Sequence, residues 1–286
     1  MSSWSKSFVE WLEGDVAFLS VPFTWELEKA RARAEELRKQ GYRVRAGGPA
    51  VDLMPHIMES VAELGGAVDA LPHHNPNATF TSRGCIRKCP FCAVWRVEGF
   101  LRELEDWPIK PIVCDNNLLA CSKKHFDDVI DKLKPLKEVD FNQGLDARLL
   151  TKYHAERLAE LDCLVRLAWD DIDLGNAFMA AYEKLRKAKI PKNRIRCYVL
   201  FGFIDTPQDA WFRLRTLKNI GIMPNPMRYQ PLNILKKNSY VGKHWTGKML
   251  TAFMRYWARL RFTAAIPFDE WLSHEYEIEL SKGGQR

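Results

Sequence analysis

Thr81-Ser-Arg-Gly-Cys85-Ile-Arg-Lys-Cys89-Pro-Phe-Cys92 is the stretch of this 286-residue chain that decides both fold and chemistry. It places three of the seven cysteines at the spacing C-x3-C-x2-C, directly after a predicted strand at 78–82. Iron–sulfur clusters are held by soft thiolate ligands, normally four. Because only three thiols stand close together here, a bound cluster would keep one iron open for a ligand that the protein does not supply.

Two other interpretations of the motif are less favoured. A structural zinc site needs a fourth Cys or His, and neither His73, His74 nor Cys114 stands at a familiar finger spacing. Three inert, buried cysteines are disfavoured by the charged neighbours Arg83 and Lys88. The remaining cysteines are scattered along the chain, so no second cluster is expected.

The motif resembles that of the radical S-adenosylmethionine (SAM) superfamily, C-x3-C-x-aromatic-C, with Phe91 as the aromatic residue. The resemblance extends over about residues 79–233. It implies that Cys85, Cys89 and Cys92 are the catalytic and metal-binding residues and hold a [4Fe-4S] cluster whose fourth iron is chelated by SAM. The implied activity is reductive cleavage of SAM to a 5′-deoxyadenosyl radical, which abstracts hydrogen from a substrate.

An alternation of strand-like and helix-like segments continues along the chain, which is typical of α/β proteins with parallel strands. Six strands are predicted after the linker at 71–77, and helices are predicted between them. The strands are Ala78–Ser82, Pro111–Cys114, Val139–Asn142, Leu164–Ala168, Arg196–Phe203 and Met227–Leu232. The helices are Lys124–Leu133, Thr151–Leu161, Asn176–Ala188 and Gln208–Ile220.

The predicted fold class is therefore α/β, with three regions. A partial (β/α)6 radical SAM barrel at 78–235 follows a small Rossmann-like α/β half-domain at 1–77. A basic, aromatic-rich helical extension occupies 236–286 and includes a predicted helix at Thr246–Phe262. In such barrels the active site lies at the carboxyl ends of the strands.

Polar residues at these strand ends are the candidate contacts for SAM or substrate. Asp115 and Asn116 follow the second strand, where the family often has Gly-Gly-Glu, and a carboxylate suits the SAM ammonium group. Gln143 and Asp146 follow the third strand, and Asp170 follows the fourth. A simple strand-end cap or surface turn is the alternative at each position.

The fifth strand is similar to the family segment that approaches the adenine. Gly202 would allow the backbone to come close, and Val199 or Phe201 could pack on the base. The alternative is a core strand followed by a helix that Thr206 caps together with Asp209.

The N-terminal region resembles part of the cobalamin-binding domain that precedes the barrel in many radical SAM enzymes. A strand at 15–23, a helix at 25–40, a strand at 42–46 and a helix at 54–64 are predicted. The region is truncated and lacks the D-x-H-x-x-G ligand motif, so cobalamin is not expected to bind.

Composition narrows the class of protein further. Apolar residues make up 47% and charged residues 28%, as in ordinary globular domains. No apolar run approaches the roughly 20 residues that span a bilayer, and a secretory leader is not expected from the first fifteen residues. A membrane location is therefore not expected. Clustered cysteines without a disulfide pattern favour the reducing cytoplasm.

Charge is distributed unevenly, because residues 184–261 contain eighteen Lys or Arg and two acids. Aromatic residues interleave with these cations from Tyr229 onward, a pattern suited to stacked nucleic-acid bases. A nucleic-acid base is therefore the leading substrate class. The alternatives are a small-molecule or carrier-bound substrate, with solvated basic faces, and a non-catalytic iron–sulfur protein. Any radical SAM activity also implies a flavodoxin or ferredoxin as electron donor.

Overall fold

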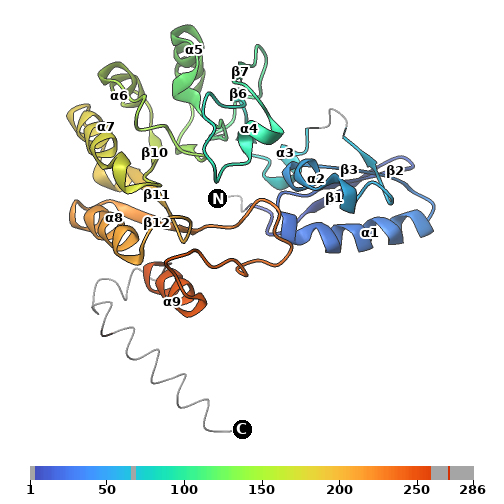
Figure 1. The fold of residues 1–286 in the computed structure, drawn as a ribbon. Coiled ribbons are helices and arrows are strands. Elements are labelled where there is room, and N and C mark those ends of the chain that lie inside the picture. Colours follow the sequence, from blue (N-terminus) through green and yellow to red (C-terminus); the bar gives the residue numbers. More distant parts are fainter. Residues whose placement is uncertain (1–3, 66–68, 259–269, 271–286) are drawn as a thin grey trace.

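The computed structural model describes residues 4–65, 69–258 and 270, which form an α/β protein (Figure 1). Its strands make a four-stranded sheet in the order β1-β2-β3-β4, a six-stranded sheet in the order β12-β11-β10-β9-β8-β5, and a small sheet of β6 and β7. Two separate hydrophobic cores fall on either side of residue 77, one at residues 17–61 and the other at 113–257.

The N-terminal unit contains the four-stranded sheet. Its elements are β1 (Val9–Glu13), β2 (Val16–Ser20), α1 (Leu27–Lys39), β3 (Arg43–Gly47), α2 (Pro49–Leu53), β4 (Glu63–Leu64) and α3 (Leu71–His74). Strands β2, β3 and β4 run parallel, whereas β1 is antiparallel to β2. The helix predicted at 54–64 is wrong, because the chain leaves the helical conformation at Met54, where Pro55 disfavours it.

The six-stranded sheet is parallel throughout, and its strands lie in chain order. The strands are β5 (Ala78–Thr79), β8 (Ile112–Val113), β9 (Val139–Phe141), β10 (Cys163–Ala168), β11 (Ile195–Phe201) and β12 (Met223–Arg228). The helices between them are α5 (Lys123–Leu133), α6 (Lys152–Leu158), α7 (Gly175–Lys187) and α8 (Pro207–Asn219). Figure 1 shows these four helices in an arc along one side of the strands.

Short elements complete the described chain. Between β5 and β8 lie β6 (Ser82–Arg83), α4 (Val94–Val97) and β7 (Arg102–Glu103). Single 3-10 turns occur at Thr24–Glu26, Pro55–Ile57, Leu118–Ala120, Ile172–Leu174 and Lys192–Arg194. No helix in the described ranges has the length and apolar character that crossing a membrane requires.

Strand β12 begins and ends four residues earlier than predicted. The observed strand includes Pro224 and Pro226, a residue type that disfavours a central strand. In the structure β12 forms the edge of the sheet, where proline is tolerated since one side of the strand needs no ladder hydrogen bonds.

The predicted C-terminal helix is present as α9 (Gly247–Ala258), and its predicted end at 259–262 lies outside the described residues. It buries Phe253, Tyr256 and Trp257 in the larger core, and Trp245 just before it is buried too. These rings therefore cannot stack with nucleic-acid bases, which corrects that part of the sequence interpretation.

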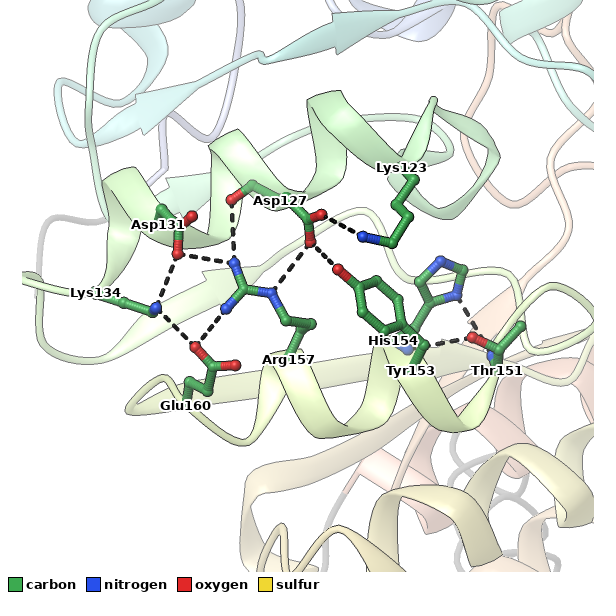
Figure 2. Close-up of polar contacts among 9 residues, drawn as sticks. All are labelled: Lys123, Asp127, Asp131, Lys134, Thr151, Tyr153, His154, Arg157 and Glu160. Atoms are coloured by element: carbon green, nitrogen blue, oxygen red, sulfur yellow. Dashed lines mark hydrogen bonds and ion pairs between the residues drawn. The ribbon is translucent and has the colours of Figure 1, made fainter.

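Helices α5 and α6 are joined by a network of charged side chains (Figure 2). Arg157 on α6 binds Asp127 and Asp131 on α5, at 3.1 and 2.8 Å. Asp127 also accepts hydrogen bonds from Tyr153 Oη and, at 2.9 Å, from Lys123 Nζ. These hydrogen bonds lower the pKa of Asp127 to about 2, and the bond from Tyr153 has the largest effect.

Replacing Tyr153 with Phe should raise the pKa of Asp127 toward its usual 3.8. Because the folded pKa lies below the unfolded one, ionised Asp127 stabilises the fold above about pH 4, and that contribution disappears as the pH falls through 2. We expect Tyr153→Phe to lower the free energy of unfolding at pH 7 by about 0.5–1 kcal/mol, a small value because these side chains are partly solvated. Urea denaturation at pH 7 and pH 2 measures this change in the free energy of unfolding, and Tyr42→Phe is the control. If Tyr153→Phe lowered the free energy of unfolding equally at both pH values, the prediction would be contradicted.

Candidate functional site

The three cysteines lie on the loop between β6 and α4, which leaves the sheet shortly after β5. All three are free and half-buried. The loop is fixed at several points by hydrogen bonds. Cys85 N donates to Gly99 O at 3.2 Å, Cys92 N donates to Cys89 O at 3.0 Å, and Trp95 Nε1 donates to Cys89 O at 3.1 Å. The loop is thus held by the short helix that follows it.

Gly84 determines how the loop begins. Its φ of +76° lies in the left-handed region, and a Cβ atom at this position would stand 2.1 Å from Phe100 O. Only glycine combines that conformation with that close approach. The turn into the cysteine motif therefore requires this residue.

Glu98 connects the two ends of this loop with the end of β8. One of its oxygens, Oε2, accepts from Arg83 Nε at 2.8 Å, from Gly84 N at 2.9 Å and from Asn116 Nδ2 at 2.8 Å. These bonds bring the predicted site residue Asn116 to the start of the cysteine loop. Glu98 was not predicted from the sequence, because its partners lie 14 to 18 residues away and follow no periodic pattern.

Replacing Glu98 with Ala should loosen the cysteine loop. Loss of residues that orient metal ligands typically lowers metal affinity about 10- to 100-fold. We expect iron retained by the reconstituted protein in the presence of a chelator to fall by that factor. Glu105→Ala, at an exposed position nearby, is the control. Iron retention equal in the two variants would contradict a role for Glu98.

Hydrogen-bond donors are already directed at one cysteine sulfur. Cys85 Sγ accepts from Arg87 N at 3.3 Å and from Asn117 Nδ2 at 3.5 Å. Burial raises the pKa of the Cys89 and Cys92 thiols, so both carry protons until a metal displaces them. Donors directed at sulfur are a common means of tuning iron–sulfur clusters.

No three His, Cys, Asp or Glu side chains of the described residues come together closely enough to share one metal ion. A zinc ion requires its ligands to converge on a single point at about 2.0–2.3 Å. A cubane cluster instead binds each thiolate to a different iron. The chemistry of the donor set, three thiols on one glycine-initiated loop with N–H groups directed at sulfur, fits a cluster.

Asp115 lies in different surroundings from those predicted for it. It is buried, and its carboxylate accepts from Thr81 N at 2.6 Å, from Thr81 Oγ1 and from Ser82 Oγ at 2.8 Å. Asp115 thereby fixes the strand end that leads into the cysteine loop. Both carboxylate oxygens therefore accept hydrogen bonds from within the chain, and a contact of Asp115 with the SAM ammonium group stays a prediction.

Asn117, two residues further on, has the free acceptor instead. Its side chain is 2% exposed, and Oδ1 has no hydrogen-bond partner among the described residues. A buried acceptor without a donor is costly unless a ligand supplies one. Asn117 Oδ1 therefore lies beside Cys85 as an open acceptor for an N–H or O–H group.

Two predicted carboxylates lie close to the cysteine loop. Asp146 accepts from Arg87, which belongs to that loop, at 3.0 Å. Asp170 accepts from Leu200 N at 3.2 Å and is near enough to Cys89 and Cys92 to affect both thiols electrostatically. Burial raises the pKa of Asp170 to about 6. The strand ends of β9 and β10 thus meet the loop, as expected from the sequence for strand termini.

The predicted adenine contacts on β11 face the other way. Val199 and Phe201 are fully buried, and Phe201 packs 5.0 Å from Phe253 of α9 and 5.5 Å from Trp245. Successive residues of a strand point to opposite faces. The side chains on the opposite face of β11 are those of Tyr198 and Leu200, so the prediction assigned the wrong face of this strand.

Gly202 and Phe91 complete the predicted set. A Cβ on Gly202 would stand 2.6 Å from Leu250 Cδ2, so α9 packs closely over this glycine. Phe91 meets the loop after β11 through Phe203, with ring centroids 6.0 Å apart. The aromatic residue of the cysteine motif therefore links it to the end of the fifth strand of the large sheet.

A cavity of about 1890 Å³ lies between the N-terminal unit and the six-stranded sheet, beside the cysteine loop. The N-terminal unit contributes Phe23, Arg45 and Asp52, and the six-stranded sheet contributes Asp140, Gln143 and Arg166. Arg83 and Glu98, which flank the cysteine motif, line it too. The predicted residue Gln143 is exposed there. Both cationic and carboxylate side chains line this cavity. Among them, Arg166 is paired with Asp140 at 2.6 Å.

Comparisons of the chain with protein-family models, with curated proteins and with solved structures find no match. The functional interpretation of the site therefore depends on the residues and contacts of this chain.

Proposed function

We propose that the chain is a radical SAM enzyme in which Cys85, Cys89 and Cys92 hold a [4Fe-4S] cluster. In this proposal the six-stranded sheet is a partial (β/α)6 barrel, and the cluster lies at the carboxyl edge of its strands. The observation that carries the proposal is the cysteine loop itself. It presents three thiols directly after the first strand of a parallel sheet whose strands follow chain order.

SAM is the proposed ligand of the open iron, and the surroundings of Cys85 support it. Asn117 Oδ1 is a buried acceptor without a donor, and the SAM amino group would supply one. Asn116 and Asp170 are the other polar residues near the cysteine loop, and both were predicted from their positions at strand ends. When bound, cluster and SAM supply one-electron cleavage of SAM and hydrogen abstraction from the substrate.

An electron donor needs access to such a cluster. Ile86 and Lys88, inside the cysteine motif, are exposed, Ile86 at 52%, and Phe100, which follows the motif, is 81% exposed. An exposed apolar patch with a cation beside it is typical of a transient protein interface. A flavodoxin or ferredoxin is the class of partner that this surface would receive.

Anaerobic reconstitution tests the proposal. We expect close to four irons and four sulfides per chain, and a change in the electron paramagnetic resonance (EPR) spectrum of the reduced cluster when SAM is added. A cluster whose spectrum is indifferent to SAM would favour a non-catalytic iron–sulfur protein. Stoichiometric zinc in place of iron would overturn the proposal.

A nucleic-acid base remains the proposed substrate class, supported by the loop between β12 and α9. Residues 210–258 contain no Asp or Glu. Lys236, Lys237 and Lys243 are exposed, and none pairs with an acid in the described part of the chain. Lys237 lies 5.4 Å over the ring of Trp25, which is stacked on Phe23 at the cavity rim. The basic loop thus meets the N-terminal unit next to Phe23, a residue that lines the cavity.

Replacing Lys236 and Lys237 with Glu should weaken binding of a single-stranded oligonucleotide. Each lysine–phosphate interaction that the substitution removes is expected to reduce the salt dependence of log K by about one. Fluorescence anisotropy at several salt concentrations measures this, with Lys39→Glu/Lys124→Glu as the charge-matched control. Equal binding by both double variants would contradict the proposed loop, and absence of salt-dependent binding by the natural sequence would contradict the substrate class.

A small-molecule or carrier-bound substrate is the second candidate, and the cavity favours it. The cavity is lined by carboxylates as well as by cations, and the paired Arg166 and Asp140 face it. Such balanced charge suits a polar substrate of modest size better than a polyanion. Stimulation of SAM cleavage by metabolite fractions but not by nucleic acid would select this candidate.

A further inference from the structure

A cluster of charged side chains joins the cysteine loop to the segment after β9. Asp146, whose side chain is 7% exposed, accepts from Arg87 Nε at 3.0 Å. The same carboxylate accepts from Arg148 Nε at 2.7 Å and from Arg148 Nη2 at 3.0 Å. The Arg148 backbone N–H also donates to Asp146, at 3.1 Å. Asp146 therefore fixes the position of two guanidinium groups, one on the loop and one beside it.

Arg148 lies beside the cysteine loop, because Asp146 joins it to Arg87 of that loop. Its positive charge also acts on the Cys89 thiol. Two guanidinium groups share a single carboxylate, so the cluster of Arg87, Asp146 and Arg148 has a net charge of +1. Asp170 contributes the opposing charge near Cys89. Arg148 is the cation whose charge favours the thiolate form of Cys89.

A positive charge beside a cysteine ligand has a defined effect on a cluster. Reduction adds one electron and so one negative charge to the cluster. Nearby cations and donors to sulfur stabilise that added charge, and hydrogen bonds to the sulfurs are among the factors that set cluster potentials. A guanidinium keeps its charge at every accessible pH, so the effect does not depend on protonation.

We propose that Arg148, oriented by Asp146, is a positioning residue that raises the reduction potential of the cluster bound by Cys85, Cys89 and Cys92. The inference rests on the proposed function, because it requires the cluster. Its role differs from that of a SAM-binding arginine, since it acts on the cluster before SAM is present. Asp146 is then the residue that keeps the cation beside the cysteine loop.

Redox titration of the reconstituted full-length protein without SAM, followed by EPR, tests this inference. We expect Arg148→Gln to shift the midpoint potential to a more negative value, and Arg148→Lys to restore much of it. Asp146→Asn should shift it in the same direction, since Arg148 is then no longer held. Arg43→Gln, which removes a guanidinium from a surface pair with Asp15, is the control and should leave the potential unchanged.

The outcomes separate this inference from the proposed function. A chain of natural sequence that takes up no cluster overturns both. A cluster whose potential is the same with Arg or Gln at position 148 overturns the inference and leaves the proposed function intact. The inference is likewise overturned if Arg148→Gln weakens SAM binding while the SAM-free potential stays unchanged. Should Arg148→Gln fail to fold, Arg148→Lys and Asp146→Asn still decide the matter.

Discussion

Cys85→Ala should abolish cluster binding and SAM cleavage together. Cys85 is the thiol that already receives hydrogen bonds from Arg87 N and Asn117 Nδ2, and the other two thiols lie on the same short loop. With only two thiolates left, one further iron loses its protein ligand, and clusters are normally held by four ligands. We expect iron content and 5′-deoxyadenosine formation to fall to background.

Cys121→Ala is the matched control for this variant, because Cys121 is also free and partly exposed. It should retain the cluster and its activity. Loss of the cluster in both variants would point to a four-cysteine site that leaves no iron open for SAM. Iron retained by Cys85→Ala at the level of the natural sequence would contradict the assignment.

Arg213→Met should destabilise the protein by about 3–5 kcal/mol, the typical cost of removing one partner from a buried ion pair. Arg213 on α8 is 0% exposed. Its guanidinium donates to Trp169 O and Leu200 O, both at 2.9 Å, and to Asp205 Oδ2 at 2.5 Å. Its loss would remove the cation that pairs with the largely buried Asp205 and would leave the carbonyl groups at the ends of β10 and β11 without this donor.

Urea denaturation measures this effect, and Arg215→Met is the control. Arg215 lies two residues further along the same helix and is exposed, so its replacement should change the free energy of unfolding by no more than about 0.5 kcal/mol. A cost below about 1 kcal/mol for Arg213→Met would show that the buried guanidinium is dispensable for the fold.

Helices and strands with strong periodicity were predictable from the sequence. The predicted helix at 208–220 is observed as α8, and Thr206 and Asp209 form the expected capping box before it. The helix predicted at 54–64 failed because Pro55 and the turn at Met54 end the preceding short helix at Leu53. Local proline chemistry decided that segment, and an apolar pattern alone could not reveal it.

The site was predictable only in part. The cysteine spacing identified the loop, and strand-end position identified Asp146 and Asp170, which lie beside it. The face of β11 was assigned wrongly although the strand alternates, with Cys197, Val199 and Phe201 on the buried face and Arg196 and Tyr198 on the other. Glu98 and Asn117 depend on contacts that form only when the loop closes against β8, so no local pattern distinguished them.

The central claim is tested most directly by chromatography for 5′-deoxyadenosine after anaerobic reconstitution, reduction with dithionite and addition of SAM. We predict that the natural sequence forms 5′-deoxyadenosine and methionine, with or without stimulation by a substrate. Cys85→Ala should form neither. A fully loaded [4Fe-4S] protein that forms no 5′-deoxyadenosine, alone or with nucleic acids or metabolite fractions, would contradict the account.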